Sequence, residues 1–184
     1  MSNKILLIFF LSLIIFSPLE ASNKDKIISN LKEINNLSFN FKQTISDKTE
    51  NGNCIVQYPK KIFCKYDNSN KKIMISNGKS LVIKNQNNNQ IYFYPLKQTP
   101  LNFILDKNYL ISQIKKLDIR TVDDTYLNFS LKENDVIINI FFDKENLDLI
   151  GWQTEDLYQN LVIFYIFDLV KNKKISKDLF KLPN

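Results

Sequence analysis

Two pairs of neighbouring carboxylates, Asp123-Asp124 and Glu155-Asp156, are the side chains of this sequence best suited to acid–base chemistry. The chain has no histidine, which excludes Ser-His-Asp and Cys-His nucleophile systems and most zinc sites. Both pairs fall between segments that alternate like strands, and acidic residues in such places favour turns. We therefore expect turns rather than catalytic residues, and no enzyme activity, no metal site and no cofactor.

The two cysteines, Cys54 and Cys64, lie five residues either side of Pro59. If a hairpin is centred on this proline, they face each other across two strands, at a separation that suits a disulfide. A disulfide is our prediction for an exported chain. The alternative is a pair of buried thiols that pack as small apolar side chains.

Composition indicates one domain with a hydrophobic core, because 44% of the 184 residues are apolar and 24% are charged. The net charge is +6. Arg120 is the only arginine, and the lysines are scattered along the chain, so we expect no nucleic-acid partner. A solvated lysine surface is the simpler interpretation, and such a surface can also assist approach to anionic membranes.

The first 21 residues are typical of a secretory signal peptide. Lys4 precedes an apolar run from Ile5 to Phe16 that only Ser12 interrupts, and Pro18 leads to a small residue, Ala21, at the expected cleavage point. The run is too short to span a membrane as a helix. We predict a leader over residues 1–21 and an exported domain over residues 22–184; an uncleaved N-terminal anchor is the alternative.

The remaining sequence predicts a mainly β protein with helices (α+β). Apolar residues recur with a helical period from Asn23 to Asn35 and from Pro100 to Leu117, where Thr99 is a candidate N-cap. Between and after these helices the period is two, and turn residues separate the segments closely enough for hairpins. We count about eleven strands in a single curved antiparallel sheet. The predicted strands are Leu37 to Ile45, Cys54 to Tyr58, Ile62 to Tyr66, Lys72 to Ser76, Ser80 to Lys84, Gln90 to Tyr94, Leu117 to Val122, Thr125 to Lys132, Asp135 to Asp143, Leu147 to Thr154 and Leu161 to Leu169.

Two of these strands are apolar on both faces. Leu161 to Phe167 has no polar residue at all, and Val136 to Phe142 has only Asn139. A sheet with one solvated face alternates more cleanly. If one face meets the helices, the other is either packed core or the wall of an apolar cavity, and the pattern alone leaves both open.

An ordered set of motifs along almost the whole mature chain resembles the periplasmic outer-membrane lipoprotein carrier family (LolA). The motifs are Phe39-x-Phe41-x-Gln43, Gly52, Tyr58-Pro59-Lys60-Lys61-Ile62, Tyr66, Ser76-Asn77-Gly78-Lys79-Ser80-Leu81, Thr99-Pro100-Leu101 within Tyr94 to Leu105, Phe142-Asp143, Leu149-x-x-Trp152, Asp156, Asn160 and Leu179-Phe180.

This resemblance implies an incomplete β-barrel with a helical lid over an apolar cavity, and no catalysis. It implies a periplasmic chaperone that shelters the acyl chains of lipoproteins. The implied partners are an ATP-driven (ABC-type) release complex in the inner membrane and an acceptor lipoprotein in the outer membrane. We expect a monomer. The alternative is a related half-barrel that binds another lipid, or that senses lipoproteins or envelope stress.

Strand alternation and the resemblance together predict which side chains line the cavity. They are Phe39, Phe41, Tyr58, Ile62, Tyr66, Leu101, Ile104 and Leu105; each could instead be ordinary core, since both environments use the same residue types. The family hairpin usually carries an arginine before the proline that bonds to the lid. Here this position is Tyr58, whose phenol has a single donor, so a lid latch at Tyr58 is the weakest part of the resemblance.

Overall fold

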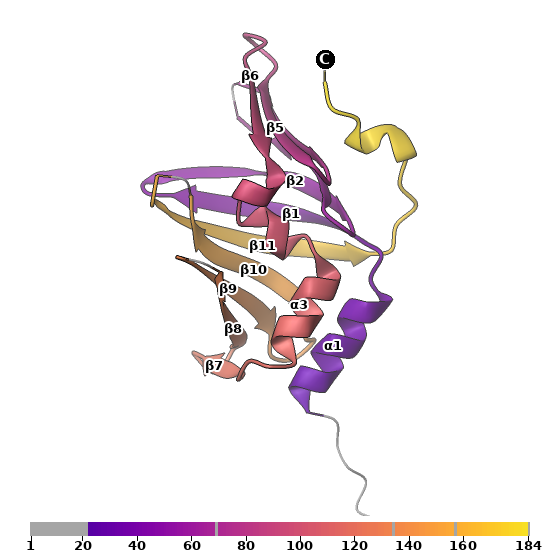
Figure 1. The fold of residues 1–184 in the computed structure, drawn as a ribbon, viewed down its shortest axis with the longest axis vertical. Coiled ribbons are helices and arrows are strands. Elements are labelled where there is room, and N and C mark those ends of the chain that lie inside the picture. The colour runs from indigo at the N-terminus through magenta and orange to yellow at the C-terminus, as the bar shows by residue number, and fades with distance from the viewer. Residues whose placement is uncertain (1–21, 69, 134, 157, 184) are drawn as a thin grey trace, which may run out of the picture.

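One open antiparallel sheet forms most of the molecule (Figure 1). The computed structural model describes residues 22–183 except 69, 134 and 157, so the predicted signal peptide lies outside the described residues. The described part contains eleven strands in the order β6-β5-β4-β3-β2-β1-β11-β10-β9-β8-β7. Their bounds are β1 (Asn36–Ile45), β2 (Lys48–Gln57), β3 (Lys61–Tyr66), β4 (Lys72–Asn77), β5 (Ser80–Asn85), β6 (Ile91–Pro95), β7 (Arg120–Val122), β8 (Tyr126–Glu133), β9 (Val136–Asp143), β10 (Leu149–Glu155) and β11 (Leu161–Lys171).

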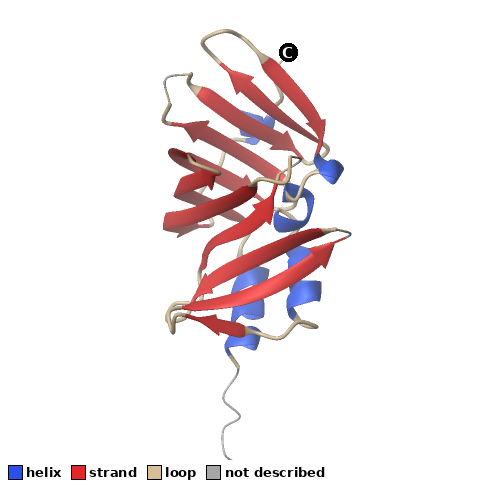
Figure 2. Cartoon of the chain, turned by 90° about the vertical axis from the view of Figure 1, so that its left-hand side faces the viewer, coloured by secondary structure: helices blue, strands red, loops and turns tan. Residues whose placement is uncertain are grey.

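The sheet consists of two meanders that are joined by one central strand pair. Strands β1 to β6 are consecutive hairpin neighbours, and so are β7 to β11. The two halves meet where β1 pairs with β11, with Phe41 opposite Ile166. The predicted fold class, an incomplete barrel built from one curved antiparallel sheet, is therefore confirmed. Figure 2 shows the sheet bending around helices that gather on one side.

The first helix, α1 (Asn23–Glu33), agrees with the predicted one. Ser22 caps it by accepting the Asp25 backbone N–H, and Ile27, Ile28 and Leu31 form its buried face. At its C-terminal end the Lys107 ammonium donates to the Ile34 carbonyl at 2.6 Å, which satisfies an acceptor that the helix leaves free.

The second helical region is not one helix, contrary to the prediction. It consists of η1 (Leu96–Gln98), α2 (Leu101–Ile104) and α3 (Lys107–Ile114), and we call residues 96–117 the helical crossover. Asp106 restarts the helix, because its carboxylate accepts the Tyr109 backbone N–H. The N-cap predicted at Thr99 is also wrong: Pro100 holds that position, and the Thr99 hydroxyl donates back to the Leu96 carbonyl.

The strand predictions hold except at several strand ends: β7 begins at Arg120 and not at Leu117, and β10 begins at Leu149 and not at Leu147. Strand β2 begins at Lys48, six residues before the predicted start, because its polar first half pairs with β1 through the backbone. Asp123 and Asp124 form the predicted turn between β7 and β8. A short 3-10 helix that was not predicted, η2 (Lys177–Phe180), lies against β3 and β4. None of the helices in the described residues is long and apolar enough to cross a membrane.

Candidate functional site

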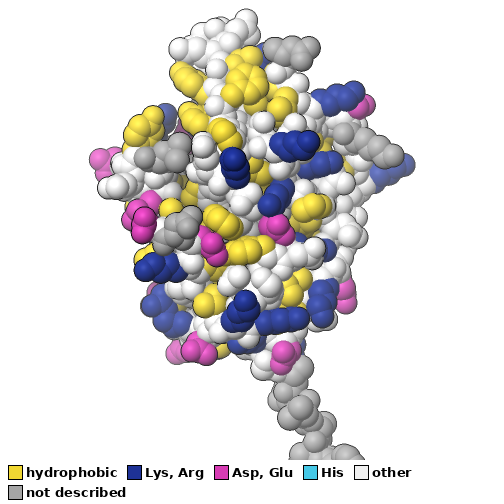
Figure 3. Space-filling view, viewed as in Figure 1, with side chains coloured by type: hydrophobic (Ala, Val, Ile, Leu, Met, Phe, Trp, Pro, Cys, Tyr) yellow, Lys and Arg dark blue, Asp and Glu magenta, His cyan; other side chains and the backbone are white. Residues whose placement is uncertain are grey.

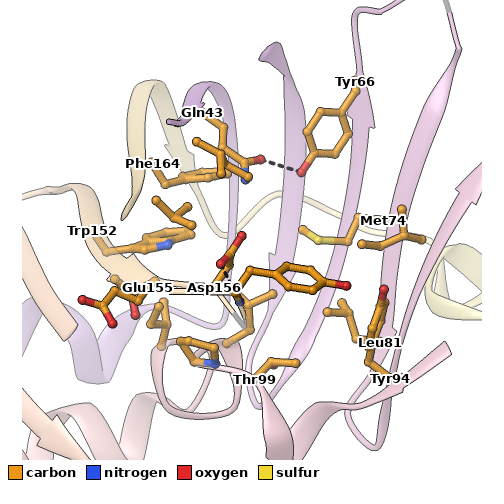
Figure 4. A pocket seen from close by; sticks show the side chains of 18 residues that line it. Gln43, Tyr66, Met74, Leu81, Tyr94, Thr99, Trp152, Glu155, Asp156 and Phe164 are labelled. Atoms are coloured by element: carbon orange, nitrogen blue, oxygen red, sulfur yellow. Dashed lines mark hydrogen bonds between the residues drawn. The ribbon is translucent and has the colours of Figure 1, made fainter. Parts of the chain in front are cut away.

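An apolar pocket of about 260 Å³ lies on the concave side of the sheet, between the sheet and the helical crossover (Figure 4). Strands from both halves of the sheet contribute to it, so Trp152 of β10 lies across the pocket from Met74 of β4. The complete lining is Gln43, Ile45, Tyr66, Met74, Leu81, Ile83, Tyr94, Thr99, Pro100, Leu101, Ile104, Trp152, Thr154, Glu155, Asp156, Tyr158, Val162 and Phe164. The curvature of the sheet therefore creates the pocket, because it turns distant strands toward one another.

A row of aromatic rings from four strands, β10, β11, β1 and β3, lies beneath this pocket. The Trp152 and Phe164 rings stack at 4.2 Å, Phe164 stacks on Phe41 at 4.7 Å, and Phe41 meets Tyr66 edge-on at 5.0 Å. Such ring pairs add stabilisation beyond the area that they bury. The row gives the pocket a rigid floor.

Gly52 makes room for this row. It pairs with Phe41 on one side and Tyr66 on the other. A Cβ atom at Gly52 would lie 2.9 Å from Phe41 Cε1 and 2.0 Å from the Lys65 carbonyl oxygen. The glycine is thus required by close approach rather than by a special backbone angle.

A polar network closes one end of the floor. The Tyr66 hydroxyl donates to Gln43 Oε1 at 2.8 Å, and the Lys72 ammonium lies 3.8 Å from the centre of the Tyr66 ring. Lys72 also forms an ion pair with Glu50, to which Asn68 donates as well. Burial raises the pKa of Glu50, but the hydrogen bonds from Lys72 and Asn68 outweigh it and hold the pKa below its usual value. Burial raises the pKa of Tyr66, which keeps the phenol neutral.

The connection between β10 and β11 forms one lip of the pocket. Asp156 organises it, because its carboxylate accepts the backbone N–H groups of Tyr158 and Asn160. These bonds outweigh the effect of burial and lower the pKa of Asp156. The Tyr158 side chain lines the pocket although it is 83% exposed. Glu155-Asp156 therefore shapes the mouth, in keeping with the expected turn.

A second cavity, of about 380 Å³, adjoins the apolar pocket, with which it shares Thr99, Pro100, Glu155 and Asp156. Its further lining includes Lys97, Phe103 and Val136.

The sequence comparison decides the family. Residues 32–183 match the family described as the outer membrane lipoprotein carrier protein LolA. The chain belongs to the LolA family. No curated protein matches the sequence.

Solved structures with this fold include other members of the LolA superfamily. An uncharacterised conserved protein from Thermus thermophilus aligns with a TM-score of 0.52 and 6% identity, over 88% of this chain and 95% of that one. MucB aligns with a TM-score of 0.50 and 10% identity, over 89% of this chain and 64% of MucB. A LolA superfamily protein from Nitrosomonas europaea gives a TM-score of 0.47 and 10% identity, over 88% and 99% of the two chains. At these identities the similarity concerns the fold alone.

The pocket brings together some of the residues that sequence analysis selected. Tyr66, Leu101 and Ile104 line it. The other predicted residues, Phe39, Phe41, Tyr58, Ile62 and Leu105, pack in or against the hydrophobic core and are absent from the lining. Phe41 stacks on the lining residue Phe164 at 4.7 Å, and Leu105 follows the lining residue Ile104 in the crossover, so both lie next to the pocket without forming its wall.

Sequence reasoning missed most of the lining. The missed apolar strand residues come from β1, β4, β5, β6, β10 and β11, namely Ile45, Met74, Leu81, Ile83, Tyr94, Trp152, Val162 and Phe164. Alternation did not single them out, because β11 is apolar on both faces and because Met74 and Leu81 have apolar neighbours in the sequence. Only the curvature of the sheet distinguishes inward residues at the pocket from inward residues under the helices.

Lys60, not Tyr58, makes the polar contacts between the β2–β3 hairpin and the helical crossover. Its backbone N–H donates to the Leu105 carbonyl at 2.7 Å. Its ammonium lies 3.1 Å from Asn102 Oδ1 and 3.3 Å from Asp106 Oδ2. Tyr58 packs against the core, and the Lys107 ammonium lies 5.9 Å from its ring centre. Within the described chain, no hydrogen bond joins the Tyr58 side chain to the crossover.

Cys54 and Cys64 are directly opposed on β2 and β3, and a disulfide joins them. Their Cα atoms lie 4.1 Å apart. Both side chains are buried in the hydrophobic core. The bond therefore fixes the hairpin that carries Lys60 to the crossover.

Proposed function

We propose that this chain is a periplasmic chaperone that shelters the acyl chains of lipoproteins in the apolar pocket and carries them toward the outer membrane. The observation that carries the proposal is the pocket itself: apolar side chains from both halves of the sheet line it, in a chain of the LolA family. The partners that follow are the inner-membrane ABC-type release complex and an outer-membrane acceptor.

The energetics of acyl chains support this proposal. Each CH₂ group removed from water contributes about 0.8 kcal/mol, so a carrier needs a matching apolar surface. Leu81, Met74, Trp152 and Phe164 provide such a surface. The predicted leader and the Cys54–Cys64 disulfide both suit an oxidising compartment outside the cytoplasm.

A matched pair of charge substitutions tests the site. Ile83→Glu places a carboxylate in the pocket wall, whereas Ile163→Glu places the same charge on the outer face of β11, where Ile163 is 37% exposed. Burial of an unpaired charge is costly. Titration of residues 22–184 with a fluorescent fatty-acyl probe should show at least about a tenfold loss of affinity for Ile83→Glu. The affinity of Ile163→Glu should stay near that of the unmodified chain.

A second assay tests the carrier role. The protein is incubated with membranes that contain a triacylated lipoprotein, and the soluble fraction is assayed for the complex. Saturable binding of the probe together with a soluble lipoprotein complex supports the proposal. Equal probe affinity for the two glutamate variants would contradict the assignment of the site.

The pocket volume favours one second candidate, a carrier of a single-chain lipid. About 260 Å³ is below the range of roughly 300–1,000 Å³ that is usual for sites that enclose larger small molecules. Three acyl chains therefore require the crossover to move, whereas one chain needs less space. Binding of the probe without extraction of the lipoprotein would favour this candidate.

A further inference from the structure

The outer edge of β6 is an open sheet edge that adjoins the pocket. Strand β6 is the last in the sheet order and pairs only with β5 among the described strands. Tyr94 of β6 lines the pocket. Figure 3 shows apolar side chains gathered toward the end of the molecule where β6 lies, and Tyr92 and Phe93 are 47% and 59% exposed.

The register identifies which backbone groups this edge presents. The Asn85 N–H donates to the Gln90 carbonyl, and the Leu96 N–H donates to the Lys79 carbonyl. Residues 90, 92, 94 and 96 therefore bond to β5, and the alternate residues turn their backbone groups outward. Ile91 and Phe93 each present one donor and one acceptor. Pro95, which has no N–H, lies at an outward position, where a strand tolerates proline.

The sequence segment that contains this edge carries charge of one sign. The segment from Asn68 to Leu105 contains five lysines and no acidic residue, and it therefore carries +5 of the net charge of +6. Lys72 is paired with Glu50. No ion pair of the described chain involves the other four, which are Lys71, Lys79, Lys84 and Lys97.

We infer that the β6 edge binds an acidic, extended peptide segment as an additional strand, while an acyl chain attached to that segment occupies the neighbouring pocket. The inference rests on the proposed function and specifies its substrate: an acylated protein whose acylated residue is followed by an acidic stretch. Strand addition supplies affinity through the free groups of Ile91 and Phe93. The lysines favour an acidic partner over a second copy, because two such edges would bring like charges together.

The short β6 edge is sufficient for binding because the acyl chain in the pocket and the peptide at the edge belong to one ligand. A strand of five residues offers too few bonds to hold a free peptide firmly. An acyl chain in the pocket converts strand addition into an intramolecular step with a high effective concentration. We therefore expect little binding of an unacylated acidic peptide.

The experiment uses N-palmitoylated eight-residue peptides and residues 22–184 of the chain. One peptide carries glutamates, a second carries lysines at the same positions, and a third is the glutamate peptide N-methylated at alternate residues. The glutamate peptide should bind at least about tenfold more tightly than the lysine peptide at low salt. It should also slow amide hydrogen exchange at Ile91 and Phe93 about tenfold, whereas the N-methylated peptide should not.

Two variants at one position separate the backbone from the side chain. Phe93→Pro removes the outward N–H and should abolish the preference for the glutamate peptide. Phe93→Ala keeps the N–H and should retain the preference.

Three results overturn the inference. In the first, the glutamate peptide binds but amide hydrogen exchange at Ile91 and Phe93 does not change. In the second, the slowing of exchange at these residues depends only on protein concentration. In the third, anionic vesicles alone slow exchange at these residues. The second would assign the edge to a second copy of the chain, and the third to a lipid surface. Failure of all three peptides to bind would instead contradict the proposed function.

Discussion

Replacement of Lys60 by methionine should speed the release of a bound acyl ligand. The substitution removes the ammonium that lies 3.1 Å from Asn102 Oδ1 and 3.3 Å from Asp106 Oδ2, but it keeps the aliphatic stem and the backbone bond to Leu105. These contacts hold the helical crossover against the β2–β3 hairpin. Their loss therefore favours the state in which the crossover has moved away.

The expected magnitude follows from the partial exposure of the pair. The Lys60 and Asp106 side chains are 30% and 25% exposed. Buried hydrogen bonds to charged groups contribute about 1.5–3 kcal/mol, and exposed ion pairs contribute about 0.2–1 kcal/mol. An intermediate value of about 1 kcal/mol corresponds to a roughly fivefold shift toward the open crossover.

The assay is stopped-flow transfer of a preloaded fluorescent acyl probe to excess lipid vesicles. Lys60→Met should raise the release rate about fivefold. Lys97→Met is the control, because Lys97 lies on η1 in the same crossover and is exposed; its release rate should match that of the unmodified chain. Equal rates for Lys60→Met and the unmodified chain would refute the reasoning, since the ligand would then leave without movement of the crossover.

Three further substitutions test the stability of the site. Gly52→Ala should lower the free energy of unfolding by about 1–3 kcal/mol or more in urea denaturation, because a Cβ atom would collide with the Phe41 ring and the Lys65 carbonyl; unchanged stability would mean that the two strands can separate. Glu50→Gln should cost roughly 1–3 kcal/mol at pH 7. Because the folded-state pKa of Glu50 lies below its ordinary value of 4.5, its contribution is complete above about pH 4.5 and is lost as the pH falls through the folded pKa, so the two stability curves should converge at acid pH. Replacement of Cys54 and Cys64 by alanine should cost about 3 kcal/mol under oxidising conditions, and a reductant should weaken the unmodified chain but not the variant.

The secondary structure was predictable because it depends on local periodicity. The two-residue alternation of Leu37 to Ile45 and the turn at Asn77-Gly78 are short-range signals, and β1 and the β4–β5 hairpin lie where they indicated. The helical crossover was the exception. Its apolar positions continued with a helical period from Pro100 to Leu117, but the Asp106 cap divided this span into two short helices, α2 and α3.

The candidate site was predictable only in part. Tyr66, Leu101 and Ile104 line the pocket, whereas Phe41 and Leu105 are buried outside its lining. Apolar lining and apolar core have the same composition, so no property of a single residue separates them. Lys60 was named only as part of a motif, because the distance between the hairpin and the crossover is not encoded in either segment alone.

The sequence by itself determined the strand count, the antiparallel class, the facing positions of Cys54 and Cys64, and the family. The first three follow from periodicity, turn residues and hairpin symmetry, all of which act over a few neighbouring residues. The family follows from the ordered motifs and from the match over residues 32–183. The tertiary structure alone decided where the pocket lies, that Trp152 faces Met74 across it, and that Lys60 holds the crossover. These depend on the summed twist and curvature of the whole sheet, in which each strand contributes a small rotation that no local pattern specifies.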